Sequence, residues 1–279
     1  MFPGATAARD DAAYVLFGAP LDASTTFEPG ARFGPRRVRR FAATFDDYDH
    51  RTGLHFSELE VHDAGDIDAF APVTEYLDFL EGVVGDAARD GATPLLVGGE
   101  HTVSVAGVRA VEPDVFVCLD AHLDLRESYA GDPLSHATTT RHALDAAEEA
   151  VILGARTGSE AEWERAERGD VTVIAPENVP AWEPDFGGSA SSPSVYLSVD
   201  VDAADPGFAP GTGTKEPFGL APRELRRAVR TVAPRAIGFD VVEVNDRDDG
   251  QAAALAGKLL RTFVSAHTAG GTNETVGGP

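Results

Sequence analysis

The sequence predicts an α/β fold of three layers, in which helices cover both faces of a mostly parallel sheet. Apolar runs of strand length alternate along the chain with longer segments whose apolar residues recur at helical spacing. The runs are continuously apolar, as expected for strands buried on both faces. Since right-handed crossovers through helices normally connect such strands, we expect one sheet between two helical layers. Residues 1–279 are expected to form a single domain.

The expected elements follow one another in regular order along the chain. Most of the strand runs end in Gly, Asp or Ser, and the runs are Ala13–Phe17, Pro94–Val97, Val115–Leu119, Ala150–Leu153, Val171–Ile174, Val195–Val199 and Ala236–Val242. Helical spacing predicts helices over Val73–Arg89, Val103–Val111, Thr139–Glu149, Glu160–Arg168, Arg223–Val232 and Ala252–His267. The low-complexity stretch Gly187–Pro193 predicts a surface loop, and the Gly/Thr-rich tail after about residue 268 is expected to be flexible.

The net charge is unusually negative. The chain has 46 acidic and 23 basic residues, a net charge of −23, and Lys215 and Lys258 are its lysines. Because salt screens the resulting self-repulsion, we hypothesise a halophilic, salt-adapted protein. No basic stripe that would bind nucleic acid is visible. The dense basic cluster Arg36, Arg37, Arg39 and Arg40 is interpreted as a solvated turn or a subunit contact.

The sequence predicts a soluble cytoplasmic protein without disulfides. Cys118 is the single cysteine and lies in an apolar run, so we expect a buried, inert thiol. The N-terminus lacks a basic segment followed by an apolar stretch, and no run approaches the roughly 18 apolar residues that a membrane helix needs. No membrane partner is therefore expected.

Three clusters of metal-ligand residues directly follow three predicted strands. Gly98-Gly99-Glu100-His101 follows the first, and its glycines allow a tight turn that presents one imidazole. Asp120, His122 and Asp124 follow the second, and Asp200 and Asp202 follow the third. Residues two apart in an extended chain share a face, so each cluster can point into one space. Carboxyl ends of parallel strands meet at one sheet edge, where binding sites form.

These six side chains offer the ligands of a binuclear metal site. Two neighbouring divalent cations need about two imidazoles and four carboxylates, some of them shared, and paired cations make water a nucleophile near neutral pH. Oxygen-rich ligation with imidazole and without thiolate favours two Mn²⁺ ions over zinc, and Zn²⁺ and Co²⁺ are the alternatives that affinity alone leaves open. The six residues are His101, Asp120, His122, Asp124, Asp200 and Asp202.

These motifs resemble those of ureohydrolases, the arginase/agmatinase family, and are closest to agmatinases. The third motif spans Ser198–Pro206, Gly30–Pro35 resembles the N-terminal segment of agmatinases, and Pro210–Pro217 resembles their guanidinium-recognition loop. The resemblance runs from about Gly18 to Glu243. It implies an arginase/deacetylase-like fold with two Mn²⁺ ions. His101 and Asp124 would bind one ion, His122 and Asp202 the other, and Asp120 and Asp200 would be shared.

The resemblance also implies roles in catalysis and substrate binding. Attack on an electron-poor guanidinium carbon would release urea. Glu216 suits a bidentate clamp on the guanidinium. Ser135-His136 resembles the Ser-His motif of the family and nominates His136 as a proton shuttle and substrate contact, with Asp124 assisting. The alternatives are a loop charge at Glu216 and a surface histidine at His136.

Several residues near these motifs depart from the family or lie outside its pattern. Ala137 and Phe218 stand where many members have Gly, and we expect Phe218 to make the pocket smaller or differently shaped. Glu243 is interpreted either as supporting the site from behind the ligands or as a solvated acid at a strand end. The histidines read as structural or exposed are His50, His55, His62, His142 and His267.

The predicted activity is hydrolysis of agmatine to putrescine and urea, a step of polyamine biosynthesis. Guanidinobutyrate or another guanidino compound is the alternative substrate. Arginine is disfavoured because Tyr129–His142 lacks the Asn-rich pattern with which arginases hold the α-carboxylate. The complete ligand set argues against a catalytically silent relative and against a one-zinc deacetylase. Family resemblance further suggests a homo-oligomer, a trimer or hexamer.

Overall fold

The computed structural model describes residues 1–185 and 193–274, and it is built on one eight-stranded sheet. The spatial order of the strands is β4-β1-β5-β10-β9-β6-β7-β8, and every neighbouring pair is parallel. The strands are β1 (Tyr14–Ala19), β4 (Val61–Asp66), β5 (Thr93–Gly98), β6 (Val115–Leu119), β7 (Glu149–Leu153), β8 (Val171–Ile174), β9 (Val195–Asp200) and β10 (Ala236–Val242). A separate hairpin pairs β2 (Tyr48–Asp49) with β3 (Leu54–His55). The predicted parallel sheet is confirmed.

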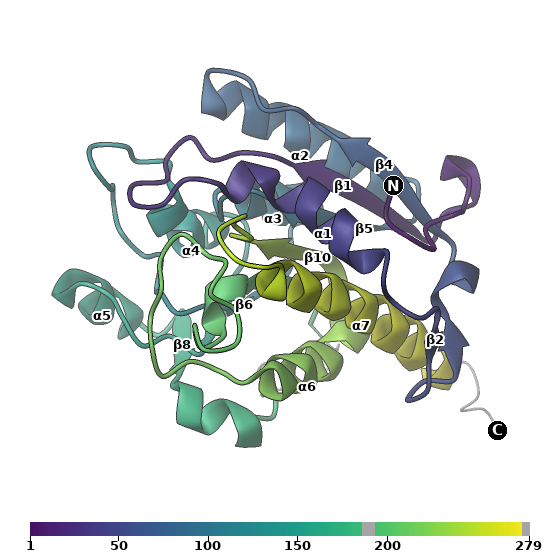
Figure 1. The fold of residues 1–279 in the computed structure, drawn as a ribbon. Coiled ribbons are helices and arrows are strands. Elements are labelled where there is room, and N and C mark those ends of the chain that lie inside the picture. Colours follow the sequence, from purple (N-terminus) through teal and green to yellow (C-terminus); the bar gives the residue numbers. More distant parts are fainter. Residues whose placement is uncertain (186–192, 275–279) are drawn as a thin grey trace.

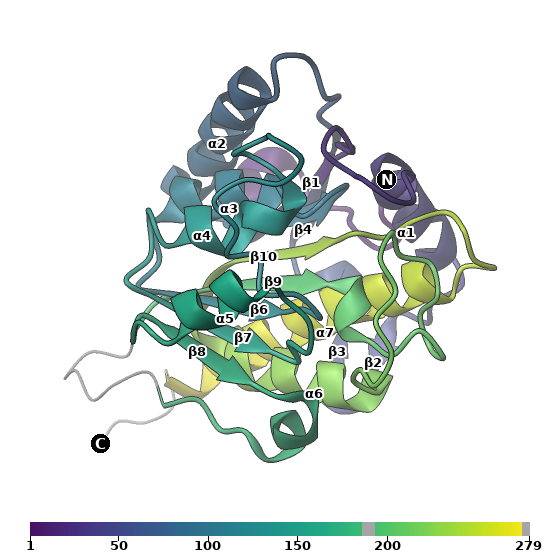
Figure 2. The same cartoon turned by 90° about the vertical axis from the view of Figure 1, so that its left-hand side faces the viewer.

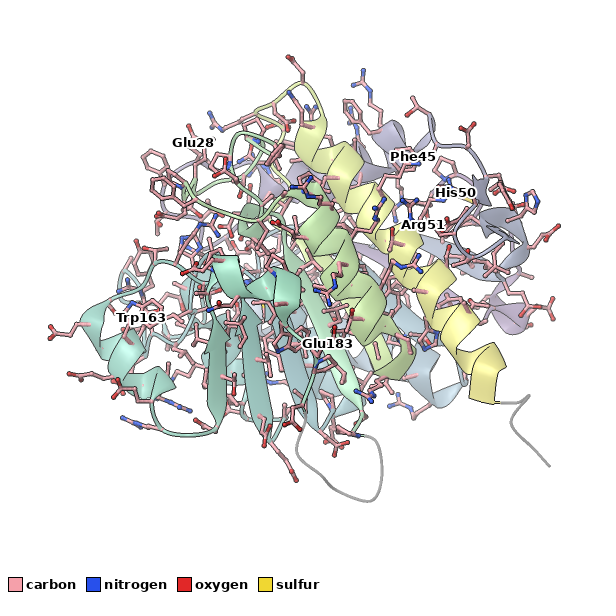
Figure 3. The ribbon with its side chains drawn as sticks, turned by 90° about the horizontal axis from the view of Figure 1, so that it is seen from below. Glu28, Phe45, His50, Arg51, Trp163 and Glu183 are labelled. Carbon is pink, nitrogen blue, oxygen red and sulfur yellow. The ribbon has the colours of Figure 1, made fainter. Side chains whose placement is uncertain are left out.

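Helices cover both faces of this sheet (Figures 1 and 2). One face carries α2 (Val73–Arg89), α3 (Val103–Val111) and α4 (Thr139–Ala143), while α5 (Glu160–Ala166) packs against β8. The other face carries α1 (Gly34–Ala42), α6 (Pro222–Val232) and α7 (Gln251–Glu274). Figure 3 shows α6 (green) and α7 (yellow) side by side on that face. The predicted three-layer α/β/α architecture is therefore confirmed.

Continuously apolar strands fill the core because each contributes residues to both helical layers. In β5, Leu95 and Val97 pack toward α1 and α7, whereas Leu96 packs toward α2 and α3, and all three are fully buried. At about 1.5–3 kcal/mol for each large apolar side chain removed from water, this alternation stabilises both layers at once. The sheet is thus a rigid platform for the loops at its edges.

Two elements, β4 and α1, differ from the prediction because their sequences are polar. Strand β4 was not predicted, since beyond Val61 its side chains are mostly polar or exposed. The basic cluster Arg36, Arg37, Arg39 and Arg40, interpreted as a solvated turn or a subunit contact, lies on helix α1. The interpretation as a turn is therefore wrong. Its Val38 and Ala42, one helical turn apart, are buried in the core. Arg39 is not solvated either, because it forms two hydrogen bonds to the buried Asp63, at 2.7 and 2.8 Å.

Helix ends account for the other differences. Helix α4 stops at Ala143, six residues before the predicted end, and the following residues form a turn into β7. Helix α7 continues to Glu274, beyond the predicted end at His267. The loop predicted over Gly187–Pro193 lies almost wholly outside the described residues, as do residues 275–279. Among the described residues, no helix is long and apolar enough to span a membrane.

Candidate metal centre

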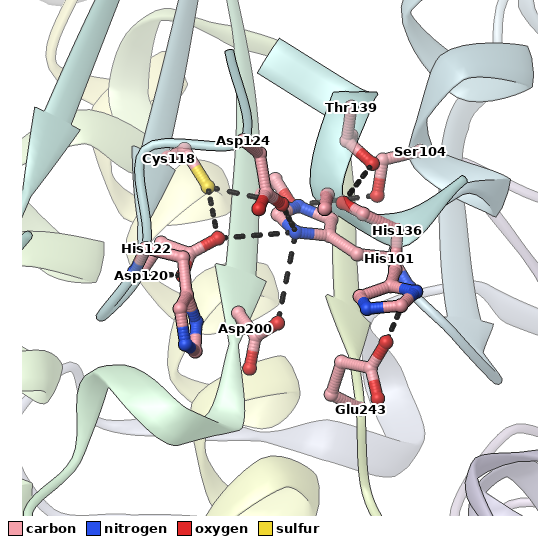
Figure 4. Close-up of polar contacts among 12 residues, drawn as sticks. His101, Ser104, Cys118, Asp120, His122, Asp124, His136, Thr139, Asp200 and Glu243 are labelled. Atoms are coloured by element: carbon pink, nitrogen blue, oxygen red, sulfur yellow. Dashed lines mark hydrogen bonds and ion pairs between the residues drawn. The ribbon is translucent and has the colours of Figure 1, made fainter. Parts of the chain in front are cut away.

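The predicted metal ligands converge at the carboxyl ends of strands that are neighbours in the sheet. His101 comes from the turn after β5, Asp120, His122 and Asp124 come from the segment after β6, and Asp200 and Asp202 come from the end of β9 and the turn beyond it. Strand β10 lies between β5 and β9 and adds Glu243 at the same edge. Figure 4 shows most of these side chains around the His101 ring. The sheet therefore brings all six predicted ligands together.

The turn that carries His101 requires glycine at one position. A Cβ atom on Gly99 would lie 1.8 Å from the Leu21 carbonyl oxygen, so no larger residue fits there. The Gly99 N–H donates to Ala19 and the Glu100 N–H donates to Leu21, which ties the turn to the segment after β1. Backbone contact at this point fixes where the imidazole of His101 enters the site.

The His101 ring is surrounded by acceptors. Its Nδ1 lies 3.1 Å from Asp120 Oδ2, 2.9 Å from Asp124 Oδ2 and 3.6 Å from Asp200 Oδ2. Its Nε2 lies 3.2 Å from Ser198 Oγ, and the Ser198 hydroxyl donates to Asp240 Oδ1 at 2.6 Å. Because the only hydroxyl proton of Ser198 is engaged by Asp240, Nε2–H must be the donor to Ser198.

This hydrogen-bond pattern makes His101 Nδ1 the ring nitrogen that is available to bind a cation. With Nε2–H donating to Ser198, the ring points Nδ1 at carboxylate oxygens, and this buried atom has no hydrogen-bond partner. A ring nitrogen and carboxylate oxygens at this distance repel unless a proton or a cation lies between them. The donor set thus fits a divalent cation at His101 Nδ1, with the other ring nitrogen held by a buried hydroxyl and carboxylate.

A second imidazole meets the same carboxylate from the other side. His122 Nδ1 lies 3.0 Å from Asp202 Oδ2 and 3.5 Å from Asp120 Oδ1. Asp120 therefore directs one oxygen to each imidazole, which suits a ligand shared between two cations. Asp120, His122 and Asp202 have ligand atoms close enough together to hold one ion, as do His101, Cys118 and Asp120. Burial raises the pKa of the Cys118 thiol, so we do not assign it as a thiolate ligand.

The crowding of carboxylates also perturbs protonation. Burial alone would lower the pKa of His122, but Asp202 and Asp120 raise it well above its usual value. Burial, reinforced by the charge of Asp120, raises the pKa of Asp124 to about 7. The pKa of Asp200 is likewise raised, by burial and by Asp202. In the absence of cations, protons are held where cations would bind, so cation binding must release them.

Backbone conformation at the site is unusual at two acidic residues. Asp124 and Glu243 both have φ in the left-handed region, at 52° and 60°. This conformation costs non-glycine residues on the order of 1–2 kcal/mol each. Such strain is commonly found at functional sites, where the surrounding structure enforces it.

Glu243 lies in the site itself, in contact with the backbone of His101. The side chain is buried, Oε1 accepts the backbone N–H of His101 at 2.8 Å, and Oε2 faces Gly213. Burial raises the pKa of this carboxyl group to about 8, with the charge of Glu100 adding to the effect. It is not a solvated strand-end acid. Its position directly after a predicted apolar strand was a signal for this role in the sequence.

His136 lines the same cavity as His101 and His122, on a short helical turn capped by Ser135. Its Nδ1 is 3.1 Å from Ser24 Oγ, and its ring packs edge-on against Tyr129. Burial, together with His122 and His101, lowers the pKa of His136 to about 4, so the ring is neutral at pH 7. His136 is therefore not a surface histidine.

Five of the six predicted ligands, all except Asp120, line one cavity of about 340 Å³ together with His136 and Glu243. Glu216 lines it from the loop after β9 and is half-buried, and Ala137 lines it as well. Phe218 does not line it: the side chain is 86% exposed, with φ of 67°. The expectation that Phe218 reshapes the pocket is therefore wrong. Arg126 and Glu162 form an ion pair at 3.2 Å in the cavity wall, a feature that sequence inspection missed.

Residues 12–265 match the arginase family. This chain belongs to the arginase family. The agmatinase of Pyrococcus horikoshii is 33% identical over 257 residues, which cover 90% of each chain. The N(1)-aminopropylagmatine ureohydrolase of Thermococcus kodakarensis is 34% identical, over 90% of this chain and 89% of the relative. The crystal structure of agmatine ureohydrolase of Thermoplasma volcanium has a TM-score of 0.90 at 33% identity, covering 98% of this chain and 95% of the other.

Membership makes this chain an arginase-family hydrolase, and enzymes of the family depend on a pair of metal ions.

Histidines outside the site have other contacts. His62 Nδ1 bonds the Ala7 carbonyl group, and His267 Nδ1 bonds the Tyr14 hydroxyl group, at 2.9 and 2.8 Å. His55 pairs with Asp47, and His142 Nε2 bonds the Pro133 carbonyl group. These contacts agree with the structural or exposed roles expected for them.

Proposed function

We propose that this arginase-family chain hydrolyses agmatine to putrescine and urea. The observation that carries the proposal is the convergence of two imidazoles and four carboxylates on one edge of the sheet, beside a cavity with further acidic groups. Agmatinase is the name of several relatives at 33–36% identity. Agmatine carries two positive charges, which matches the acidic character of the site.

Two Mn²⁺ ions are proposed as the cofactor. His101 and Asp124 would hold one ion, His122 and Asp202 the other, with Asp120 and Asp200 shared between them. Oxygen-rich ligation by carboxylates with imidazole suits Mn²⁺, and Cys118 as a protonated thiol does not select a softer metal. When bound, the pair supplies a water-derived nucleophile at neutral pH and positive charge for the transition state.

Two carboxylates outside the proposed ligand set are assigned to the substrate. Glu243 is rigid, because the His101 N–H holds Oε1, and Oε2 remains to accept from a guanidinium N–H. A cationic guanidinium group would also favour the ionised form of this carboxyl group, whose pKa is raised by burial. Glu216, predicted from the sequence as the guanidinium clamp, lines the same cavity on a loop tied down by Arg156, whose guanidinium group binds the Glu216 carbonyl oxygen at 2.7 Å.

His136 is proposed as the proton shuttle. Cleavage forms a bond from water oxygen to the guanidinium carbon and breaks the bond from that carbon to the chain nitrogen. The leaving nitrogen must then gain a proton. A neutral imidazole in the cavity wall can take one proton from the attacking water and return it to the amine.

A urea-release screen tests the substrate. We expect release from agmatine in the presence of Mn²⁺ at high salt, with much lower rates on arginine and guanidinobutyrate. N(1)-aminopropylagmatine belongs in the screen because a relative is named for it. Activity on arginine alone, or on guanidinobutyrate alone, would overturn the assignment of agmatine.

Variants test the roles within the site. His122→Ala is expected to lose Mn²⁺ and turnover together, and unchanged activity would rule out the proposed centre. Glu243→Gln should lower kcat/KM for agmatine by about 10- to 150-fold, since a charged hydrogen bond to the reacting group contributes about 1.5–3 kcal/mol. Glu216→Gln is the matched comparison, and the larger loss identifies the guanidinium partner.

A further inference from the structure

A serine from the N-terminal part of the chain stands between His136 and a buried carboxylate. The Ser24 backbone N–H donates to Glu100 Oε2 at 2.8 Å, and the Ser24 hydroxyl group donates to Glu100 Oε1 at 2.9 Å. The same hydroxyl oxygen accepts the His136 backbone N–H at 3.0 Å and lies 3.1 Å from His136 Nδ1. Ser24 thus contacts both the carboxylate and the proposed proton shuttle.

Glu100 has only donors around it. Besides the two groups of Ser24, the Thr102 hydroxyl group donates to Oε1 at 2.8 Å, and the Glu100 side chain is fully buried. Several donors and no acceptor are the surroundings that an ionised carboxylate requires.

The single hydroxyl proton of Ser24 then decides the hydrogen-bond direction at His136. Because that proton points to Glu100, Ser24 Oγ can only accept from Nδ1, so Nδ1 must carry the imidazole proton. His136 lines the cavity, and its Nε2 has no hydrogen-bond partner among residues 1–185 and 193–274. Nε2 is therefore left with a free lone pair.

We propose that Ser24 and Glu100 are positioning residues that hold His136 as its Nδ1–H tautomer, so that Nε2 is the nitrogen that exchanges protons with substrate and water. The inference deepens the proposed function, because it rests on His136 being the shuttle. Nε2 takes a proton from the attacking water as the oxygen–carbon bond forms. It returns that proton to the leaving nitrogen as the carbon–nitrogen bond breaks, and the Nδ1 proton stays in place throughout.

The tautomer is directly measurable by NMR. The ring nitrogens of ¹⁵N-histidine-labelled protein distinguish Nδ1–H from Nε2–H, and loss of one signal set in His136→Asn assigns His136 among the eight histidines. The spectra would be recorded at neutral pH and high salt with Zn²⁺, since paramagnetic Mn²⁺ broadens the lines. We expect the Nδ1–H tautomer at His136. An Nε2–H tautomer in the unmodified protein would overturn the proposal.

Glu100→Gln should reverse the tautomer. The Ser24 backbone N–H can only donate, so it requires the amide oxygen on its side, and the amide NH₂ group then faces the Ser24 hydroxyl oxygen. Ser24 must in turn donate to Nδ1, which moves the imidazole proton to Nε2. Retention of Nδ1–H in this variant would contradict the proposed chain of hydrogen bonds.

Two further variants separate positioning from general destabilisation. Ser24→Ala removes the hydroxyl group and should give both tautomers in exchange. Thr102→Val removes a donor to Glu100 without touching Ser24, so it should keep Nδ1–H. A Thr102→Val spectrum that matches Glu100→Gln would show that any disturbance of Glu100 suffices and would overturn the specific role of Ser24.

Turnover supplies the second readout. Glu100→Gln should lower kcat for urea release by about tenfold or more with little change in KM, because a wrongly protonated imidazole loses part of the 10²–10⁴-fold that acid–base catalysis contributes. An altered KM with unchanged kcat would contradict the role in proton transfer. The NMR result does not depend on turnover, so inactivity on every guanidino compound would count against the proposed function and leave the tautomer measurement intact.

Discussion

Replacement of Asp240 by asparagine tests whether a buried network sets the metal affinity of His101. Asp240 is fully buried and accepts the Ser198 hydroxyl group at 2.6 Å and the Tyr196 hydroxyl group at 2.9 Å, one on each oxygen. Asparagine fills the same space but keeps only one acceptor oxygen. One of the two hydroxyl groups must then lose its acceptor.

Either orientation of the asparagine amide group is unfavourable. If the NH₂ group faces Ser198, the serine hydroxyl group turns to donate to His101 Nε2, and the imidazole proton moves to Nδ1, where a cation would bind. If it faces Tyr196, a buried phenol proton lacks its acceptor. Loss of an outer hydrogen-bond partner of a metal-binding histidine typically weakens metal affinity 10–100-fold, which corresponds to about 1.4–2.7 kcal/mol.

Calorimetric titration of the metal-free protein with Mn²⁺ at high salt measures this change. We expect Asp240→Asn to weaken one of two binding events by 10–100-fold, as for other outer partners of metal-binding histidines. Tyr196→Phe is the matched control, because it keeps the Ser198–Asp240 bond; its unfolding free energy should fall by about 1–2 kcal/mol while Mn²⁺ affinity stays within about threefold. Wild-type affinity for both ions in Asp240→Asn would refute the reasoning.

Three further predictions concern stability. Burial would raise the pKa of Asp63, but its hydrogen bonds to Arg39 lower it, so the pair should stabilise the fold above about pH 4 and lose this effect as pH falls. Asp63→Asn should therefore lower the unfolding free energy by about 3 kcal/mol at pH 7. It should also make the urea-unfolding midpoint less dependent on pH in the acid range, and an unchanged dependence would contradict this. Phe218→Gly removes the backbone strain of an exposed residue with left-handed φ. Thermal unfolding should therefore show a stability that is unchanged or raised by up to about 1 kcal/mol, with the KM for agmatine unaltered. A loss of more than about 1 kcal/mol would refute the strain argument. The net charge of −23 predicts a lower melting temperature at 0.1 M than at 2 M KCl, because like charges repel one another over a Debye length of about 10 Å at the lower salt. Equal melting temperatures would exclude salt adaptation.

Apolar strands and amphipathic helices could be predicted from the sequence because burial on two faces leaves a continuous pattern. Val115–Leu119 and Ala236–Val242 were predicted with the bounds that the structure has. Strand β4 could not be predicted, because it lies at the sheet edge and uses Asp63 to pair with Arg39 from a helix that was itself read as a turn. Partners of this kind are invisible in either segment alone.

The same distinction holds for the candidate site. Proposed ligands such as His101 and Asp120 were identifiable because each follows an apolar run and strand ends meet at one edge. The contacts of Ser24 could not be anticipated, since they join residues 76 and 112 positions apart. For Glu243 the sequence left two roles open, because nothing in its segment shows that the His101 backbone N–H donates to one of its oxygens.

The place of β10 in the sheet has a consequence for how the protein is made. Among the described residues this strand is the last in chain order, yet it lies between β5, which leads to His101, and β9, which ends at Asp200. A nascent chain that stops before Ala236 therefore has two half-sheets with no strand to join them. Because such long-range pairing forms slowly, cation capture should be a late event of biosynthesis, completed only after β10 has left the ribosome.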